Sequence, residues 1–308
     1  MLRTLARSVG LPIAEIRRPL PATARPLVVA HRGASSVLAE HTLSAYTWAI
    51  DAGADALECD VRLTRDGHLV CVHDRTVDRT SDGRGAVSTL ELTDLAALDF
   101  ASWQSDSAPA GPPEGSERRA VSGSEPDRIS TDDLGVLTLE RLLEVVVDAP
   151  RPIRLLIETK HPTRYAGLVE YELINLLRRF GLVTDDAKPE PGAGSATGVT
   201  VMSFAPLALR RMRFLAPKLP TVLLMNALLP GRRAGQLTSS AQIGGPSIRL
   251  IRQDPDYIRR LHERGNRAYV WTVDSEQDVE LCLDLGVDAI ITNRPAQVRL
   301  QVDSRLGR

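Results

Sequence analysis

The chain has 308 residues, of which 43% are hydrophobic, and a formal net charge of -1 at pH 7. This length suits one large α/β barrel or two smaller domains, and we favour a single domain. Basic residues are spread along the chain, which argues against the dense cationic surface of a nucleic-acid-binding protein. A small anionic ligand held by a few local cations is compatible with this charge.

Signals of secretion or membrane insertion are weak in this sequence. Residues 1–26 form an N-terminal extension that is interrupted by charged residues and lacks the apolar segment of a secretory signal. Three cysteines without a CxxC pair indicate neither a disulfide framework nor a zinc knuckle. No stretch has the length and apolarity of a membrane span. We therefore expect a cytoplasmic protein without stable membrane insertion, whose oligomeric state the sequence does not indicate.

From residue 27 to residue 300, short β-branched runs alternate with helical periodicity, which predicts repeated βα units in one domain. The predicted strands are 27–31, 56–61, 69–73, 154–158, 199–203, 221–225, 247–251, 267–272 and 288–292. The predicted helices are 42–52, 137–147, 165–180, 205–215, 255–263 and 275–285. Nine strands are one too many for an eight-stranded barrel. One of them is therefore an edge hairpin, an extra strand or no strand, and 247–251 is the weakest.

Three segments interrupt this alternation and are rich in Gly, Pro, Ser and charge: 101–133, 185–198 and 230–246. Such composition buries too little apolar surface to offset ordering entropy, so we expect loops there. The first is a flexible insertion after the third predicted strand, which either shapes access to a site or is merely a tolerated loop. Residues 301–308 are expected to form a C-terminal tail.

Three carboxylates stand on predicted strands where a hard cation can be bound. Glu58 and Asp60 are two residues apart on a strand, so their side chains share a face, about 6.6 Å apart along it. Alone, such a pair is more often solvated or salt-bridged than a metal site. Glu158 ends the apolar run 154–157, where an unpaired charge is costly unless a cation neutralises it. Three carboxylates without a Cys or His set at ligand spacing favour Mg²⁺ or Ca²⁺ over zinc.

His31 and His73 each end an apolar run. A single such histidine is more often a hydrogen-bonded strand end, but two of them near three carboxylates favour catalysis. Paired imidazoles can take a proton from a nucleophile and return one to a leaving oxygen, although the sequence does not settle which does which. Arg32 and Lys160 supply positive charge for phosphoryl oxygens or for salt bridges to the carboxylates. Trp271 ends a predicted strand and either walls the pocket or packs in the core.

Short motifs follow one another in a fixed order along the chain. They are AHRGA at 30–34, EHT at 40–42, GADALECDV at 53–61, TRDG at 64–67, HD at 73–74, RT at 79–80, ETK at 158–160, SF at 203–204, WTVD at 271–274, GVD at 286–288 and TNRP at 292–295. In this order they resemble the glycerophosphodiester phosphodiesterase family, over about residues 28–295. The motifs are long and specific.

This resemblance implies a (β/α)8 TIM barrel of the phosphodiesterase type with a small insertion and a site at its C-terminal face. The family's functional positions would fall on residues singled out above: the catalytic pair on His31 and His73, the metal ligands on Glu58, Asp60 and Glu158, and the phosphate contacts on Arg32 and Lys160.

Two positions depart from the family pattern. His41 stands where an asparagine usually helps to order the first loop, and it either donates that hydrogen bond, perturbs His31 or contacts the metal. Asp274 stands where the family usually has asparagine, which adds a negative charge near the site.

The predicted function is metal-dependent hydrolysis of a small-molecule glycerophosphodiester to glycerol 3-phosphate and an alcohol. Attack by water and attack by the glyceryl hydroxyl, with a cyclic intermediate, both stay open. The alternatives are lysophospholipase D-type hydrolysis of lysophospholipids, proton abstraction beside a carboxylate with Lys160 as base, and a non-catalytic barrel that binds phosphodiesters.

Overall fold

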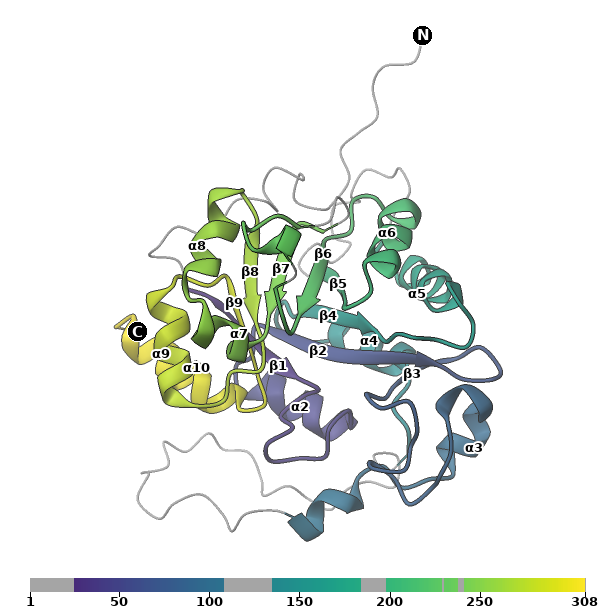
Figure 1. Cartoon of the computed structure of the whole chain (residues 1–308). Helices are drawn as coiled ribbons and strands as arrows, with labels where there is room; N and C mark the ends of the chain where they lie inside the picture. The colour runs from purple at the N-terminus through teal and green to yellow at the C-terminus, as the bar shows by residue number, and fades with distance from the viewer. Residues whose placement is uncertain (1–24, 108–134, 184–197, 229, 238–240, 308) are drawn as a thin grey trace.

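The computed structural model describes residues 25–107, 135–183, 198–228, 230–237 and 241–307. Within these residues, eight parallel strands close into a barrel, because β1 pairs with β9 on one side and with β2 on the other (Figure 1). The barrel strands are β1 (Leu27–His31), β2 (Ala56–Leu63), β4 (Arg154–Thr159), β5 (Val199–Ser203), β6 (Thr221–Met225), β7 (Ile243–Pro246), β8 (Arg267–Val270) and β9 (Ala289–Thr292). The predicted (β/α)8 TIM barrel is confirmed.

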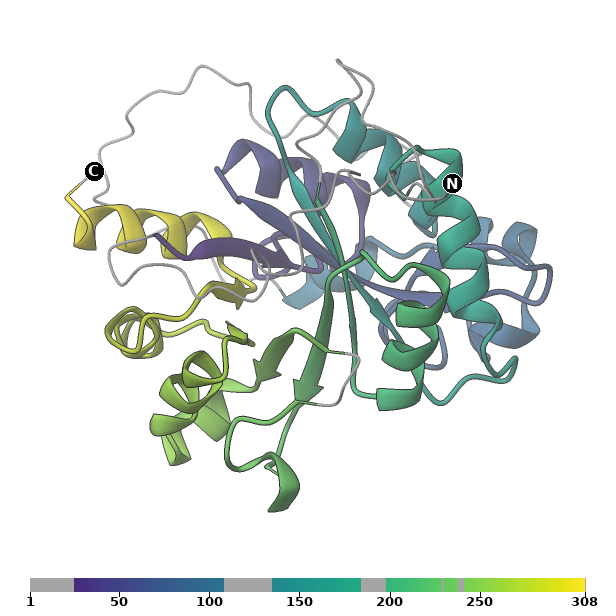
Figure 2. The same cartoon turned by 90° about the horizontal axis from the view of Figure 1, so that it is seen from above.

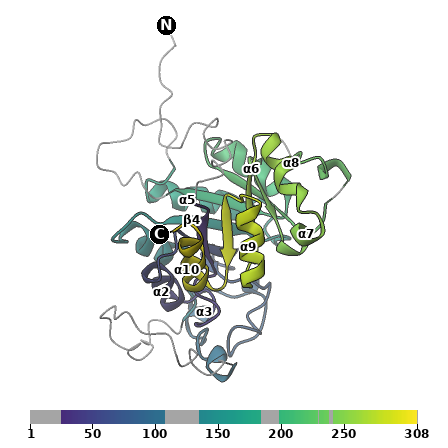
Figure 3. The same ribbon diagram turned by 90° about the vertical axis from the view of Figure 1, so that its left-hand side faces the viewer.

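Helices surround the barrel and connect successive strands. The α-helices are α2 (Leu43–Asp51), α3 (Leu92–Ala96), α4 (Leu139–Val147), α5 (Leu168–Arg179), α6 (Pro206–Leu215), α7 (Ile248–Gln253), α8 (Asp256–Glu263), α9 (Glu276–Asp284) and α10 (Pro295–Arg305). Short 3-10 helices are η1 (Val87–Thr89), η2 (Ser102–Ser107) and η4 (Pro230–Arg232). Seen from above, α10 lies beside β1, so the last helix covers the first strand (Figure 2). Figure 3 shows α9 and α10 side by side. No helix in the described ranges is both long and apolar enough to cross a membrane.

The alternation of side chains along each strand divides the core into two layers. On β4, Leu155 and Ile157 face the helices, whereas Leu156 joins a cluster inside the barrel. Because successive side chains point to opposite faces, Glu158 follows Leu156 into the interior. On β2, Ala56 belongs to the interior cluster in the same way, which places Glu58 and Asp60 above it. Strand periodicity therefore carries all three carboxylates into one end of the barrel.

Eight of the nine predicted strands are present, but one of them lies outside the barrel, and one barrel strand was not predicted. The predicted strand 69–73 is β3 (Leu69–Cys71), which pairs antiparallel with β2 outside the barrel and is thus the edge hairpin. The prediction of a strand at 247–251 is wrong, because Ser247 caps helix α7 with its side chain. The sixth barrel strand, β7, lies in the segment 230–246 that was predicted to be a loop.

A small satellite core sits on the β2–β3 hairpin. This cluster packs η1 and α3 onto the barrel, and its buried members are Val70, Val72, Val77, Val87, Leu95 and Phe100. Of the insertion predicted at 101–133, residues 102–107 form η2, and 108–134 lie outside the described residues. The predicted loop at 185–198 also lies outside them, except for its last residue. Helix α10 includes residues 301–305, so the tail expected from residue 301 is helical for most of its length.

Candidate active site

The turn after β1 brings the first functional side chains to the barrel rim. His31 ends β1, and Arg32 adopts a φ of 57°, a left-handed conformation that is uncommon for a residue with a side chain. Gly33 continues the turn at φ 83°, where an added Cβ would lie 2.8 Å from Ala45. The Arg32 N–H donates to both the backbone oxygen and the Oε2 of Glu58, at 3.0 and 3.1 Å. These bonds fix the turn on β2.

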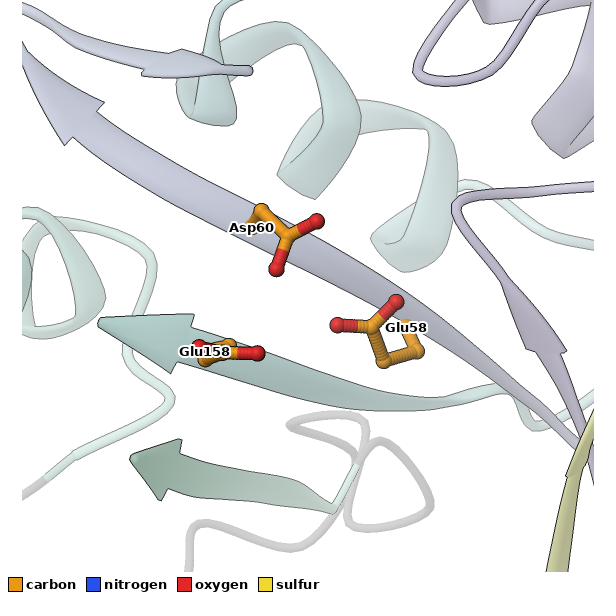
Figure 4. Close-up of side chains that lie close together, drawn as sticks. All are labelled: Glu58, Asp60 and Glu158. Carbon is orange, nitrogen blue, oxygen red and sulfur yellow. The ribbon is translucent and has the colours of Figure 1, made fainter. Parts of the chain in front are cut away.

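Glu58, Asp60 and Glu158 form a buried carboxylate cluster. Each offers one oxygen such that the three oxygens lie within 4.8 Å of one another. Figure 4 shows the carboxyl groups of Glu58 and Asp60 on β2 and of Glu158 on the adjacent β4 turned toward one another. Their exposed fractions are only 1%, 1% and 7%. The cluster predicted from the sequence is therefore brought together in space.

Two cations meet these carboxylates. The Arg32 Nε lies 3.1 Å from Asp60 Oδ2, and the Lys160 Nζ lies 2.9 Å from both Asp60 Oδ1 and Glu158 Oε1. Burial opposes ionisation of Asp60, but Lys160, the hydrogen bond from His41 and Arg32 outweigh it and hold its pKa well below the usual range.

The other two carboxylates behave in the opposite way. Burial, together with the neighbouring charge of Asp60, raises the pKa of Glu158 to about 8. The same two causes raise the pKa of Glu58 well above its usual value. The two local cations therefore do not suffice to ionise all three carboxylates at neutral pH. An all-oxygen donor set that needs further positive charge to ionise fully fits a divalent hard cation such as Mg²⁺ or Ca²⁺.

Both candidate histidines line one cavity with Glu58 and Glu158 of this cluster. The His31 Nδ1 lies 2.7 Å from Asn293 Oδ1, and its Nε2 lies 4.0 Å from Glu58 Oε2. Burial, and next the charge of Arg32, lower the pKa of His31 to about 3. The His73 Nδ1 lies 2.6 Å from Asp74 Oδ1, and its side chain is 33% exposed. Burial also lowers the pKa of His73.

The remaining walls of the cavity are aromatic and apolar. Trp271 lies directly after β8, and its Nε1–H donates to the Gly245 oxygen at 2.7 Å, which holds the ring in place. Phe204, which is 40% exposed, meets this ring edge-on with centroids 5.3 Å apart. Met202, Leu224 and Ile291 complete the apolar lining. Trp271 thus lines the cavity, which was one of its two predicted placements.

All eight residues predicted for the site lie in this cavity or in the adjoining cluster. Two asparagines of the site had no predicted role: Asn226, which lines the cavity directly after β6, and Asn293, which follows β9 and contacts His31. The position immediately after a barrel strand was the available signal for both. Glu40 was also missed; it accepts bonds from Arg32 and Arg79 across the first loop, a pairing that no sequence spacing indicates.

His41 contacts the cluster through Asp60. It is buried with a φ of 63°; its Nε2 lies 3.0 Å from Asp60 Oδ2, and its Nδ1 lies 2.8 Å from the Tyr46 hydroxyl. The Tyr46 hydroxyl in turn donates to the Glu58 backbone oxygen. Of the three roles considered for His41, donation of a hydrogen bond at the site is the one that this geometry supports.

Replacing His41 by alanine is expected to lower the free energy of unfolding by about 2 kcal/mol, because buried Asp60 loses a donor. His41→Asn should lose less, since asparagine tolerates a positive φ and its amide can donate to the same oxygen. Urea denaturation of both variants measures the difference. Equal losses would contradict the hydrogen-bonding role.

Comparisons with known proteins agree with this geometry. Residues 31–297 match the model of the glycerophosphoryl diester phosphodiesterase family. The probable glycerophosphodiester phosphodiesterase 1 of Mycobacterium tuberculosis is 42% identical over 280 residues, which cover 89% of this chain and 91% of that protein. A glycerophosphodiester phosphodiesterase of Bacillus subtilis is 32% identical over 275 residues, or 88% of this chain and 84% of its own length.

Solved structures share the fold. A phosphodiesterase from Oleispira antarctica, in complex with the product sn-glycerol 3-phosphate, superposes with a TM-score of 0.70 at 20% identity, covering 91% of this chain and 97% of that one. A putative glycerophosphoryl diester phosphodiesterase from Silicibacter pomeroyi gives a TM-score of 0.69 at 22% identity, covering 95% and 97%. The chain therefore belongs to the glycerophosphoryl diester phosphodiesterase family, a family of phosphoric diester hydrolases.

Proposed function

We propose that this protein hydrolyses glycerophosphodiesters to glycerol 3-phosphate and an alcohol, using a divalent cation. One observation carries the proposal: two carboxylates of the buried cluster, two imidazoles and two cations line a single cavity at one end of the barrel, and the third carboxylate, Asp60, pairs with both cations. The names of the relatives support the reaction, and the Oleispira antarctica structure holds glycerol 3-phosphate as its product. A small-molecule phosphodiester is thus the ligand expected here.

Glu58, Asp60 and Glu158 would hold the cation, which is Mg²⁺ or Ca²⁺ by the chemistry of these oxygens. When bound, such an ion polarises phosphoryl oxygens and stabilises the charge that develops on them in the transition state. Arg32 and Lys160 bind the phosphoryl group beside it. Asp60 and Glu40 each pair with a nitrogen of the Arg32 guanidinium and fix the orientation of its plane, so that it can bind a phosphate oxygen without reorienting.

His31 is assigned the role of base. Its lowered pKa keeps the ring neutral at pH 7. Because Nδ1 donates its proton to Asn293 Oδ1, the lone pair on Nε2 is available at the site. It accepts the proton of the attacking hydroxyl, whether that belongs to water or to the glyceryl group.

His73 is assigned the role of acid. Burial lowers its pKa, but Asp74 accepts its Nδ1–H, which orients the ring and offsets part of that lowering. The more exposed side chain can be reprotonated from solvent. Its Nε2 then donates a proton to the oxygen of the leaving alcohol. The pair thereby takes up one proton and returns one in each turnover.

The substrate proposal is tested with glycerophosphocholine, glycerophosphoethanolamine, glycerophosphoinositol and lysophosphatidylcholine, each assayed with Mg²⁺ and with Ca²⁺. We expect glycerol 3-phosphate from the first three and no turnover in EDTA. Lysophosphatidylcholine is included because the exposed edge of Phe204 beside Trp271 offers apolar surface for an acyl chain. Inactivity toward all four substrates, with folded and metal-loaded protein, would refute the proposal.

Metal binding should release a proton from Glu158. Because its pKa is held at about 8, binding below that pH displaces a proton, and the apparent affinity for Mg²⁺ should rise up to about tenfold per pH unit between about pH 6.5 and 8. Over the same interval the metal-free protein should lose stability, because the folded state binds more protons than the unfolded chain. Calorimetric titration in buffers of different ionisation enthalpy counts the protons. Glu158→Gln should lower the number of protons released, with the remainder coming from Glu58, whose pKa is also raised. A pH-independent affinity in the wild type would contradict the prediction.

A further inference from the structure

Asp274 lies in the loop after β8, and its carboxylate accepts hydrogen bonds from the last residue of β9 and from the residue that follows it. Its Oδ1 accepts from the Thr292 hydroxyl at 2.9 Å and from the Asn293 backbone N–H at 2.8 Å. Its Oδ2 accepts from the Asn293 side-chain Nδ2 at 2.7 Å. Two loops at the barrel rim are joined in this way, and both bonds to Asn293 end on the same carboxylate.

The Asn293 side chain connects Asp274 to His31. Its Oδ1 lies 2.7 Å from the His31 Nδ1 and 2.8 Å from the Ser35 hydroxyl, which also lies 2.8 Å from the His31 backbone oxygen. Ser35 does not determine which way the amide faces, since a hydroxyl can donate to Oδ1 or accept from Nδ2. An imidazole nitrogen can likewise do either. Among these neighbours, only the Asp274 carboxylate is restricted to accepting.

We propose that Asp274 is a positioning residue that sets the tautomer of His31. By accepting the Asn293 amide N–H, it turns the amide oxygen toward His31, and this oxygen requires a proton on Nδ1. The lone pair of the neutral ring then lies on Nε2, toward Glu58 and the cavity. The consequence for catalysis rests on the proposed role of His31 as base, whereas the tautomer itself does not.

Exchanging Asp274 and Asn293 tests the relay, by which we mean the hydrogen bonds from Asp274 through Asn293 to His31. In Asp274→Asn, the Asn293 backbone N–H can only donate, so it holds the new amide oxygen at the position of Oδ1 and leaves the new NH₂ facing the Asn293 side chain. The two NH₂ groups would then meet unless the Asn293 amide turns over. Its Nδ2 would in that case donate to His31 Nδ1 and move the ring proton to Nε2. In Asp274→Asn combined with Asn293→Asp, the carboxylate at position 293 faces His31 and the amide lies at position 274. The carboxylate oxygens again accept from His31 Nδ1–H, so the original tautomer should return. Thr292→Val is the matched control, because it removes a bond to the same carboxylate but leaves the amide in place.

The readout is the ¹⁵N NMR signal of the His31 ring in histidine-labelled protein, assigned by its loss in His31→Gln. We expect Nδ1–H in the wild type, in Thr292→Val and in the exchanged double variant, but Nε2–H in Asp274→Asn. If Asp274→Asn retains Nδ1–H, the inference is overturned. If Asp274→Asn fails to fold, the double variant decides, because loss of Nδ1–H there also overturns the inference.

Kinetics separate this inference from the proposed function. A base that carries its proton on Nε2 cannot accept another there, so kcat of Asp274→Asn on glycerophosphocholine should fall by about 10²-fold, with KM little changed. The double variant should recover most of this loss. A wild type that is inactive on glycerophosphodiesters, with the tautomer switching as expected, would refute the function alone. An active wild type with an unchanged tautomer in Asp274→Asn would refute the relay alone.

Discussion

Replacing Asp60 by asparagine is expected to abolish detectable metal binding and to destabilise the metal-free protein by about 3 kcal/mol. Asp60 has the largest set of partners in the site: Arg32, Lys160 and His41 all lie within 3.1 Å of its oxygens. Removing its charge leaves these groups buried without their anion, a change that is far more costly than loss of an exposed pair. The same substitution replaces one of the three anionic oxygen ligands of the proposed cation site by a neutral amide oxygen.

Calorimetric titration with Mg²⁺ and urea denaturation in EDTA measure the two effects of Asp60→Asn. Glu144→Gln is the matched control, because Glu144 pairs with Arg141 at 2.7 Å on the exposed face of α4. An exposed pair of this kind is worth about 1 kcal/mol at most, and it should not alter metal binding. An Asp60→Asn variant as stable as Glu144→Gln would show that the buried network does not support the fold.

The barrel was predictable because most of its strands carry the apolar signature of a sheet buried on both faces. The run RLLIE, for example, marks β4 at its correct place. The strand β7 has the sequence IGGP, and it escaped prediction because packing there requires the absence of side chains. An added Cβ would lie 2.7 Å from the Leu261 side chain at Gly244 and 2.8 Å from those of Leu224 and Val222 at Gly245. Close packing, rather than propensity, makes this segment a strand.

The reactive groups of the site were predictable for a related reason. The carboxyl ends of parallel strands converge, so Glu58, Glu158 and His31 had to approach one another once the barrel was assumed. The groups that orient them were not predictable in the same way. The contact from Asp274 through Asn293 to His31 joins loops at opposite ends of the sequence, and the His41 contact depends on a positive φ. Hydrogen-bond direction appears only when the loops are placed in space.

His31→Ala and His73→Ala are expected to lower kcat on glycerophosphocholine by about 10²- to 10⁴-fold each. The two variants should differ in activity on a glycerophosphodiester whose leaving group is p-nitrophenol. Nitrophenolate departs without a proton, so His73→Ala should recover most of its activity on this substrate. His31→Ala should remain impaired, because the attacking hydroxyl must still lose a proton. His68→Ala, at the exposed turn of the β2–β3 hairpin, is the control that should leave both rates unchanged.

The release of nitrophenolate is measured in the presence of saturating metal. It distinguishes His31 as base and His73 as acid from the opposite assignment. The structure favours His31 as base because its ring is the more deeply buried of the two and lies beside Arg32, so it resists protonation in the resting site. If the activated substrate restored His31→Ala and left His73→Ala impaired, the two rings would exchange roles. Asn293 would then have to accept from a ring that also carries a proton on Nε2. Such a ring is positively charged, and keeping that charge in the resting site would work against both its burial and the charge of Arg32.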